Sequence, residues 1–168
     1  MSMPYSDHRF NADIYALVKG HKHDRVLDIG AGAGKWGHLL QTLVPHIDAV
    51  EVYRPYIQHF KLWETYMNVF CCTADDCTVD GYDLCIMGDV LEHMTVFDAQ
   101  LFLSRLQDAR VSIIVMVPFE YEQGICYGNE HERHLQPDLT HELFMERYPG
   151  FTPVKVTDGF GLYFMEAR

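Results

Sequence analysis

The sequence predicts a doubly wound α/β domain whose mostly parallel sheet ends in an antiparallel hairpin. Three observations support this prediction: an apolar strand with a glycine-rich turn at residues 25–37, alternating strand and helix patterns, and two consecutive strand patterns at the end. Alternating strands and helices build parallel sheets with helices on both faces. The 168 residues fit a single domain, residues 1–168, without a linker, repeat or low-complexity stretch.

The first part of the chain alternates helical and strand patterns. Residues 11–19 place apolar side chains on one side of a helix, and the apolar run at residues 25–29 is expected to be the first strand. Residues 35–43 repeat apolar side chains at helical spacing and end before Pro45. A second strand is expected at residues 47–52.

The middle of the chain continues the alternation. Helical spacing returns at residues 55–67, and residues 69–72 are expected to form a buried third strand. A fourth strand at residues 82–87 is followed by a helix at residues 95–107. Residues 111–117 are almost continuously apolar, which is typical of a strand covered on both faces.

The end of the chain departs from the alternation. Residues 137–147 are expected to be a helix, whereas residues 152–157 and 161–166 are two β-like runs separated by a turn that contains Asp158 and Gly159. Two strands joined by so short a turn predict a hairpin. This hairpin would close an otherwise parallel sheet.

The charge balance disfavours nucleic acid as a partner. The chain has 13 Lys and Arg against 24 Asp and Glu, a formal net charge of −11, and its basic residues form no stripe. Polyanion binding depends on such clusters, so small molecules, sugars or protein groups are favoured as partners. Ten histidines exceed what a core usually holds, so some are expected at a site that titrates near neutral pH.

The sequence favours a cytoplasmic location. The first ten residues lack the apolar core of a signal peptide, and no run approaches the roughly 20 apolar residues of a membrane span. Five cysteines, an odd number, predict reduced thiols. Cys71 and Cys72, with Cys77 nearby, are more simply explained as small apolar residues of a buried strand than as metal ligands.

Glycines at alternate positions follow the first strand. Gly30, Gly32 and Gly34 come directly after Asp28 and its strand. Glycine permits positive φ and lets a ligand approach the backbone more closely than a Cβ atom allows. A nucleoside-bearing cofactor is therefore expected at this turn. Glu51, at the end of the second strand, is placed to accept hydrogen bonds from ribose hydroxyls.

Polar residues also follow the third and fourth strands. Asp75 and Asp76 come after the third strand, where a carboxylate can accept a hydrogen bond from the amino group of adenine. The fourth strand ends in Gly88 and Asp89, followed by the sequence VLEH. In doubly wound sheets ligands bind outside the carboxyl ends of the strands, so these residues are expected to meet at one site.

These four strand ends resemble those of the class I S-adenosylmethionine-dependent methyltransferases. DIGAGAG resembles the glycine-rich motif of that family, Glu51 its ribose-binding acid, Asp75 its adenine-side acid, and GDVLEHM its motif after the fourth strand. The resemblance covers nearly the whole chain, including the final hairpin. The last third further resembles small microbial and phage methyltransferases with an N-x-x-E-x-H element before the final helix.

The resemblance implies a seven-stranded Rossmann-like sheet, S-adenosylmethionine as methyl donor and S-adenosylhomocysteine as product. The cofactor-binding residues expected from the motifs are Asp28, Gly30, Ala31, Gly32, Gly34, Trp36, Glu51, Val52, Tyr53, Asp75, Asp76, Gly88, Asp89, Val90 and His93. Trp36 also has the helical spacing of a core residue, and Tyr53 could instead be a surface aromatic. Lys35 or its helix N-terminus could meet the carboxylate of the cofactor.

The chain departs from the family pattern in two places. Only residues 73–81 separate the third and fourth strands, so the usual helix there is expected to be rudimentary or absent. There is also no sizeable insertion or N-terminal extension to serve as a lid. Residues 118–136, or a partner subunit in a homodimer, would have to cover the acceptor.

Histidines are the candidate catalytic residues, because acceptors with acidic protons need a base. His93 lies just after the fourth strand, where the methyl group is expected, although it could equally pack on the cofactor or cap a turn. His131 and His134 are further candidates for binding the acceptor or acting on it. The preferred acceptor is a small polar or sugar-containing metabolite, and the resemblance does not supply the atom that is methylated.

The same loop raises the question of a metal. Imidazole and carboxylate ligands lie within a short span at Glu130, His131, Glu132, His134 and His141. Their spacing matches no closed structural metal site. A polar substrate loop is therefore favoured, and no metal is expected.

Two other functions use similar features. A nicotinamide-dependent oxidoreductase could use the same strand and glycine turn, but GDVLEHM and the final hairpin argue against it. A binding module without catalysis could keep the fold and the cofactor pocket. Methylated product would exclude the binding module, and a test of NADH binding would separate the oxidoreductase.

Overall fold

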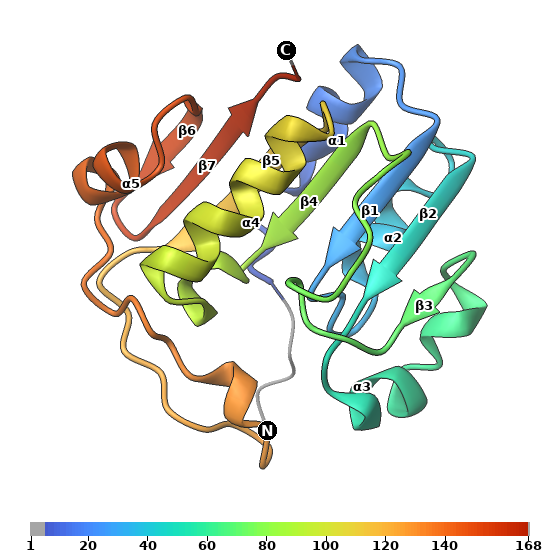
Figure 1. The fold of residues 1–168 in the computed structure, drawn as a ribbon, viewed down its shortest axis with the longest axis horizontal. Coiled ribbons are helices and arrows are strands. Elements are labelled where there is room, and N and C mark those ends of the chain that lie inside the picture. Colours follow the sequence, from blue (N-terminus) through green and yellow to red (C-terminus); the bar gives the residue numbers. More distant parts are fainter. Residues whose placement is uncertain (1–5, 168) are drawn as a thin grey trace.

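The computed structural model describes residues 6–167, and within them the chain forms one seven-stranded sheet (Figure 1). The order is β3-β2-β1-β4-β5-β7-β6; β1 to β5 are parallel, while β7 pairs antiparallel with β5 and β6. This confirms the predicted fold class. The strands are β1 Arg25–Ile29, β2 His46–Val50, β3 Val69–Phe70, β4 Leu84–Gly88, β5 Ser112–Pro118, β6 Thr152–Thr157 and β7 Phe160–Met165.

Helices cover both faces of the sheet. The α-helices are α1 Asn11–Gly20, α2 Lys35–Leu40, α3 Arg54–His59, α4 Val96–Asp108 and α5 His141–Arg147, with 3-10 turns at Leu62–Glu64, Leu91–His93 and Glu130–Glu132. One core lies between α1, α2 and the sheet, and another lies between α4, α5 and the opposite face (Figure 1). No helix in residues 6–167 is long and apolar enough to cross a membrane.

Three predicted helices are shorter in the structure. The helix expected at residues 35–43 ends at Leu40. The helix expected at residues 55–67 stops at His59 because Lys61 adopts a left-handed conformation with φ of 48°. The last helix begins at His141, since the Thr140 side chain caps it by accepting a hydrogen bond from the amide of Leu143. Apolar residues at helical spacing therefore extend beyond the helix ends, which are set by backbone conformation and by capping.

The prediction of a buried third strand at residues 69–72 is wrong. Strand β3 has two residues, pairs only with β2 at the sheet edge, and leaves the Phe70 side chain 43% exposed. Cys71 is exposed as well, and all five cysteines are free. The described segment between β3 and β4 holds turns and no helix, as expected.

Trp36 packs tightly against Gly88 at the end of β4. A Cβ atom on Gly88 would lie 2.4 Å from Nε1 of the buried Trp36. We expect Gly88→Ala to lower the free energy of unfolding by about 1–3 kcal/mol, because this overpacks a filled core. Urea denaturation measures this change in the free energy of unfolding. Gly20→Ala is the control, since nothing lies within 4 Å of its added methyl; equal stability of both variants would contradict the prediction.

Candidate functional site

The described residues line a cavity of about 740 Å³ at the carboxyl ends of β1, β2, β4 and β5. This volume falls in the range of about 300–1,000 Å³ that small-molecule sites occupy. Strand connections run outward in opposite directions from β1 and β4, so the cavity lies at the switch point of the sheet. In Figure 1 the orange loop, residues 118–136, lies beyond these strand ends.

The glycine turn brings backbone directly to the cavity wall. Gly30 has φ of 70°, and a Cβ atom there would lie 2.5 Å from a methyl of Val90. The amides of Gly30 and Ala31 both donate to the carbonyl of Val50, at 2.9 and 3.2 Å. The turn is thereby fixed against the end of β2, and its amides point at protein acceptors.

Glu51 links the glycine turn to the chain after β2. One carboxylate oxygen accepts from the amide of Gly32 at 2.9 Å and the other from the amide of Tyr53 at 2.8 Å. The side chain lines the cavity and the residue is 4% exposed. Burial raises the pKa of this carboxyl, and the two amides partly offset that rise.

The segment before α1 crosses the end of β4. The Ser6 hydroxyl donates to the carbonyl of Gly88 at 2.9 Å, and the amide of Asp7 donates to the carboxylate of Asp89 at 3.1 Å. Lys35 Nζ donates to the carbonyls of Ser6 and Asp7. Burial lowers the pKa of Lys35 to about 8 and raises that of Asp89 to about 7. Lys35 is therefore engaged with this segment, which does not support its predicted role toward a cofactor carboxylate.

Residues 118–136 cover the cavity from the other side. The Tyr53 hydroxyl donates to the carbonyl of Tyr127 at 3.3 Å, which joins the loop to the chain after β2. Inside the loop, Gln123 Nε2 donates to the carbonyl of Glu132 at 2.7 Å. Loop side chains form much of the lining, which agrees with the expectation that this loop provides the cover.

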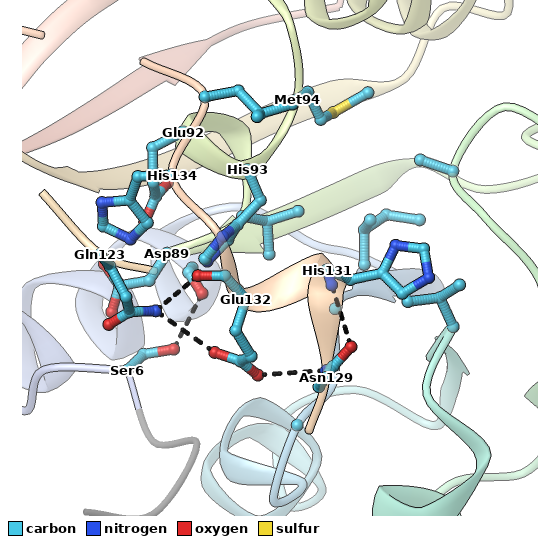
Figure 2. A pocket seen from close by; sticks show the side chains of 18 of the residues that line it. Ser6, Asp89, Glu92, His93, Met94, Gln123, Asn129, His131, Glu132 and His134 are labelled. Carbon is cyan, nitrogen blue, oxygen red and sulfur yellow. Dashed lines mark hydrogen bonds and ion pairs between the residues drawn. The ribbon is translucent and has the colours of Figure 1, made fainter. Parts of the chain in front are cut away.

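A carboxylate and two imidazoles meet where the loop faces the turn after β4 (Figure 2). One ligand atom from each of Glu92, His93 and His134 lies within 4.8 Å of the other two. The two imidazole rings meet edge to face, with centroids 4.7 Å apart. His131 points away from this group in Figure 2, although it also lines the cavity.

Hydrogen bonds set the tautomers of both imidazoles. His93 Nδ1 donates to the carbonyl of Arg133 at 3.1 Å, and His134 Nδ1 donates to the carbonyl of Tyr121 at 2.7 Å. A carbonyl only accepts, so Nδ1 carries the proton and a neutral ring keeps its lone pair on Nε2. Burial lowers the pKa of both histidines, which favours the neutral form.

The structure brings eleven of the predicted site residues to the cavity, and six others do not line it. Those that line it are Gly30, Gly32, Glu51, Val52, Asp75, Gly88, Asp89, Val90, His93, His131 and His134. Asp28, Ala31, Gly34, Trp36, Tyr53 and Asp76 are not among the described lining residues.

Three of the residues outside the lining have partners within the protein. Asp28 is fully buried and accepts a hydrogen bond from the Tyr66 hydroxyl. Trp36 belongs to the core beneath Gly88, and Asp76 accepts from the Thr73 hydroxyl. The direct cofactor contacts predicted for these three residues are therefore not supported. Their positions fix the backbone that forms the wall.

The cavity is strongly acidic. No Lys or Arg occurs among the described residues that line it. The acidic lining residues are Asp7, Glu51, Asp75, Asp89, Glu92, Asp98 and Glu132. Such a surface favours ligands that carry a positive charge and disfavours phosphates.

Sequence reasoning missed two parts of this site. Glu92 lies within GDVLEHM, and an acid between Leu91 and a histidine in a short apolar run is the signal that identifies it. Ser6 and Asp7 carry no motif. They reach the site only through contacts with residues more than 80 positions away.

No family model and no curated protein matches the chain. Among solved structures, the methyltransferase domain of the bacterial protein CtHen1 is 20% identical, with 93% of this chain and 96% of that one covered and a TM-score of 0.67. The N-terminal domain of EvdMO1, solved with S-adenosylhomocysteine, is 9% identical, with coverage of 97% and 83% and a TM-score of 0.69.

A third similar structure is the Burkholderia thailandensis 1,6-didemethyltoxoflavin-N1-methyltransferase, with its substrate and S-adenosylhomocysteine bound. It is 21% identical, with 95% of this chain and 76% of that chain covered and a TM-score of 0.63. At these identities the comparisons establish a shared fold, the Rossmann-like fold of these methyltransferases.

Proposed function

We propose that the protein is an S-adenosylmethionine-dependent methyltransferase that acts on a small-molecule acceptor. The acidic cavity at the switch point of the sheet is the observation that carries this proposal. S-adenosylmethionine is a sulfonium cation without phosphate, so carboxylates around it are favourable. The pyrophosphate of a nicotinamide dinucleotide would be repelled by the same carboxylates, and no described lining residue is a lysine or arginine that could offset them.

The glycine turn supports the same choice of cofactor. A dinucleotide site uses free backbone amides and a helix N-terminus to bind pyrophosphate. Here the amides of Gly30, Ala31, Gly32 and Gly34 all donate to protein oxygens. The turn therefore favours a ligand that approaches the backbone closely and has no phosphate that would need free amides. Glu51 beside it is the candidate acceptor for ribose hydroxyls, and Asp75 the candidate for the adenine amino group.

The structural neighbours add support. EvdMO1 and the B. thailandensis enzyme were solved with S-adenosylhomocysteine, and the latter with a small-molecule substrate. The carboxylate-lined cavity suits a small polar or sugar-containing acceptor of the kind expected from the sequence. Residues 118–136 of the same chain supply part of its lining and are the candidate cover.

Methyl transfer would proceed by in-line displacement. A lone pair of the acceptor attacks the methyl carbon as the carbon–sulfur bond breaks, and that bonding pair stays on sulfur to give neutral S-adenosylhomocysteine. The acceptor proton passes to a base or to water. His93, His131 and His134 line the cavity and are the candidate bases, and the lowered pKa of His93 and His134 keeps them neutral and able to accept.

Calorimetric titration with S-adenosylhomocysteine and NADH tests the cofactor. We expect saturable binding of S-adenosylhomocysteine with one site per chain, and no binding of NADH at matched concentrations. Incubation with methyl-labelled S-adenosylmethionine and a panel of small acceptors then tests catalysis. Binding of NADH alone would sink the proposal, while cofactor binding without transfer across a broad panel would favour a non-catalytic binding module.

A further inference from the structure

Glu92 is a buried carboxylate without a hydrogen-bond partner among the described residues. It is 1% exposed, both of its oxygens lack a hydrogen bond, and it lines the cavity. Within residues 6–167, the one basic group in ion-pair range is His134, whose Nε2 lies 3.9 Å from Oε1 and is too far for a hydrogen bond. An unpaired buried carboxylate is costly, so it calls for a ligand or a proton.

Two imidazole rings lie beside this carboxylate, with one ligand atom of each within 4.8 Å of a Glu92 oxygen. The Nδ1 atoms of His93 and His134 are held by backbone carbonyls, which leaves Nε2 of each neutral ring as an acceptor. A carbonyl on the second ring nitrogen is the arrangement that orients histidine ligands in metal sites. Both rings are thus prepared to coordinate an ion, and neither uses Nδ1 to do so.

The surrounding charges also favour a cation. The carboxylates of Asp89 and Glu132 act electrostatically on Glu92, and both oppose a further negative charge there. Glu132 faces the group from the loop side, as Figure 2 shows. The cationic Lys35 acts electrostatically on Asp89, and its ammonium donates to the carbonyls of Ser6 and Asp7.

We propose that Glu92, His93 and His134 bind a divalent transition-metal ion. Two imidazoles and one carboxylate suit ions such as Zn²⁺, Mn²⁺ or Fe²⁺ and leave coordination positions open. Ligand atoms about 2.1 Å from one ion lie about 3–3.4 Å apart, so donors now within 4.8 Å would close by roughly 1.8 Å at most.

The open positions of the ion would face the cavity, because all three ligands line it. Water or an oxygen atom of the acceptor would complete the coordination shell. A bound ion would polarise such an oxygen and lower the pKa of a hydroxyl. This last role rests on the proposed function, whereas binding of the ion does not, and proton acceptance would then fall to His131 or water.

Metal retention by the full chain tests the site. Metal-free protein is dialysed separately against Zn²⁺, Mn²⁺ and Mg²⁺, and the bound metal is counted per chain. We expect one Zn²⁺ or Mn²⁺ per wild-type chain, and loss of that ion in Glu92→Gln and His134→Gln. His59→Gln is the matched control, because His59 is an exposed histidine outside the cavity, and it should retain the ion.

Thermal unfolding provides a readout that does not depend on activity. At an ion concentration about 100 times Kd, the wild-type Tm should rise on the order of 5 °C. Glu92→Gln should show no such rise, and without metal it should be at least as stable as the wild type, because the amide removes a buried charge. Equal metal content and equal Tm shifts in the wild type and Glu92→Gln would overturn the proposal, as would preferential retention of Mg²⁺.

Titration with S-adenosylhomocysteine separates this inference from the proposed function. Metal-free wild type and Glu92→Gln should bind it with affinities within about threefold of each other, since the ion serves the acceptor side. Loss of metal binding with retained S-adenosylhomocysteine binding would show that the ion site and the cofactor site are distinct. A chain that binds the ion but no S-adenosylhomocysteine would refute the methyltransferase proposal and leave the metal site standing.

Discussion

Glu51→Ala is expected to weaken S-adenosylhomocysteine binding at least 100-fold. The carboxylate is 4% exposed, lines the cavity and already accepts from the amides of Gly32 and Tyr53. Its remaining lone pairs are the candidate acceptors for the ribose hydroxyls. Hydrogen bonds to a charged group contribute about 1.5–3 kcal/mol each, so loss of two corresponds to about 100-fold or more. The freed Gly32 amide also loosens the wall.

Isothermal titration measures this loss, with two variants as references. Glu51→Gln keeps the shape and one acceptor oxygen, so it should bind more weakly than the wild type and more tightly than Glu51→Ala. Glu64→Ala removes an exposed acid that pairs with Lys61 and does not line the cavity, so it should leave affinity unchanged. Wild-type affinity in Glu51→Ala would contradict the assignment of Glu51 as the ribose-binding residue.

The fold was predictable because its evidence is local. Strand β5 is almost continuously apolar and β1 is mostly apolar, and the helices between them repeat apolar side chains at helical spacing. Their alternation permits few arrangements other than a parallel sheet. The hairpin β6–β7 was recognisable from its short polar turn. None of these features depends on contacts distant in sequence.

Element ends and the edge strand were not predictable in the same way. Strand β3 is apolar in sequence, yet only the tertiary arrangement decides that it lies at the sheet edge with Phe70 exposed. Helix α3 stops where Lys61 turns left-handed, and a lysine gives no sign of this. The spacing of apolar residues indicates which side chains can be buried. It does not determine how many elements the fold packs against them.

The cofactor side of the site was more predictable than the acceptor side. Glu51 follows β2, Gly88 and Asp89 lie at the end of β4, and the carboxyl ends of parallel strands meet at one edge. The group of Glu92, His93 and His134 depends on a loop that returns about 40 residues later. Residues 130–141 offer ligand types compatible with a metal but no matching spacing, whereas in the structure His134 meets two residues that follow β4.

Asp28→Asn is expected to stabilise the protein at alkaline pH and to have little effect in acid. Asp28 is fully buried and its Oδ1 has no hydrogen-bond partner. Burial raises its pKa to about 7 from an ordinary value of 3.8; the Tyr66 hydroxyl opposes the rise and Glu51 adds to it. The folded protein therefore favours the protonated carboxyl, and the unfolded chain favours the carboxylate.

The sign of the pH dependence follows from this difference. An acid with a raised pKa in the folded state contributes fully to stability below its unfolded pKa, and that contribution is lost as pH rises from about 4 through about 7. A difference of this size corresponds to about 4 kcal/mol as an upper bound. Asparagine has no charge to bury, so the variant should keep the stability that the wild type loses.

Urea denaturation across a pH series measures the effect. Asp28→Asn and wild type should unfold at similar urea concentrations near about pH 4, and the variant should gain up to about 4 kcal/mol near about pH 8. Asp48→Asn is the contrasting control. Burial opposes ionisation of Asp48, but hydrogen bonds from Tyr82, His46 and Asn68 lower its pKa, so its replacement should destabilise the protein at alkaline pH. A constant effect of Asp28→Asn at every pH would show that the Asp28 carboxylate carries no penalty in the fold.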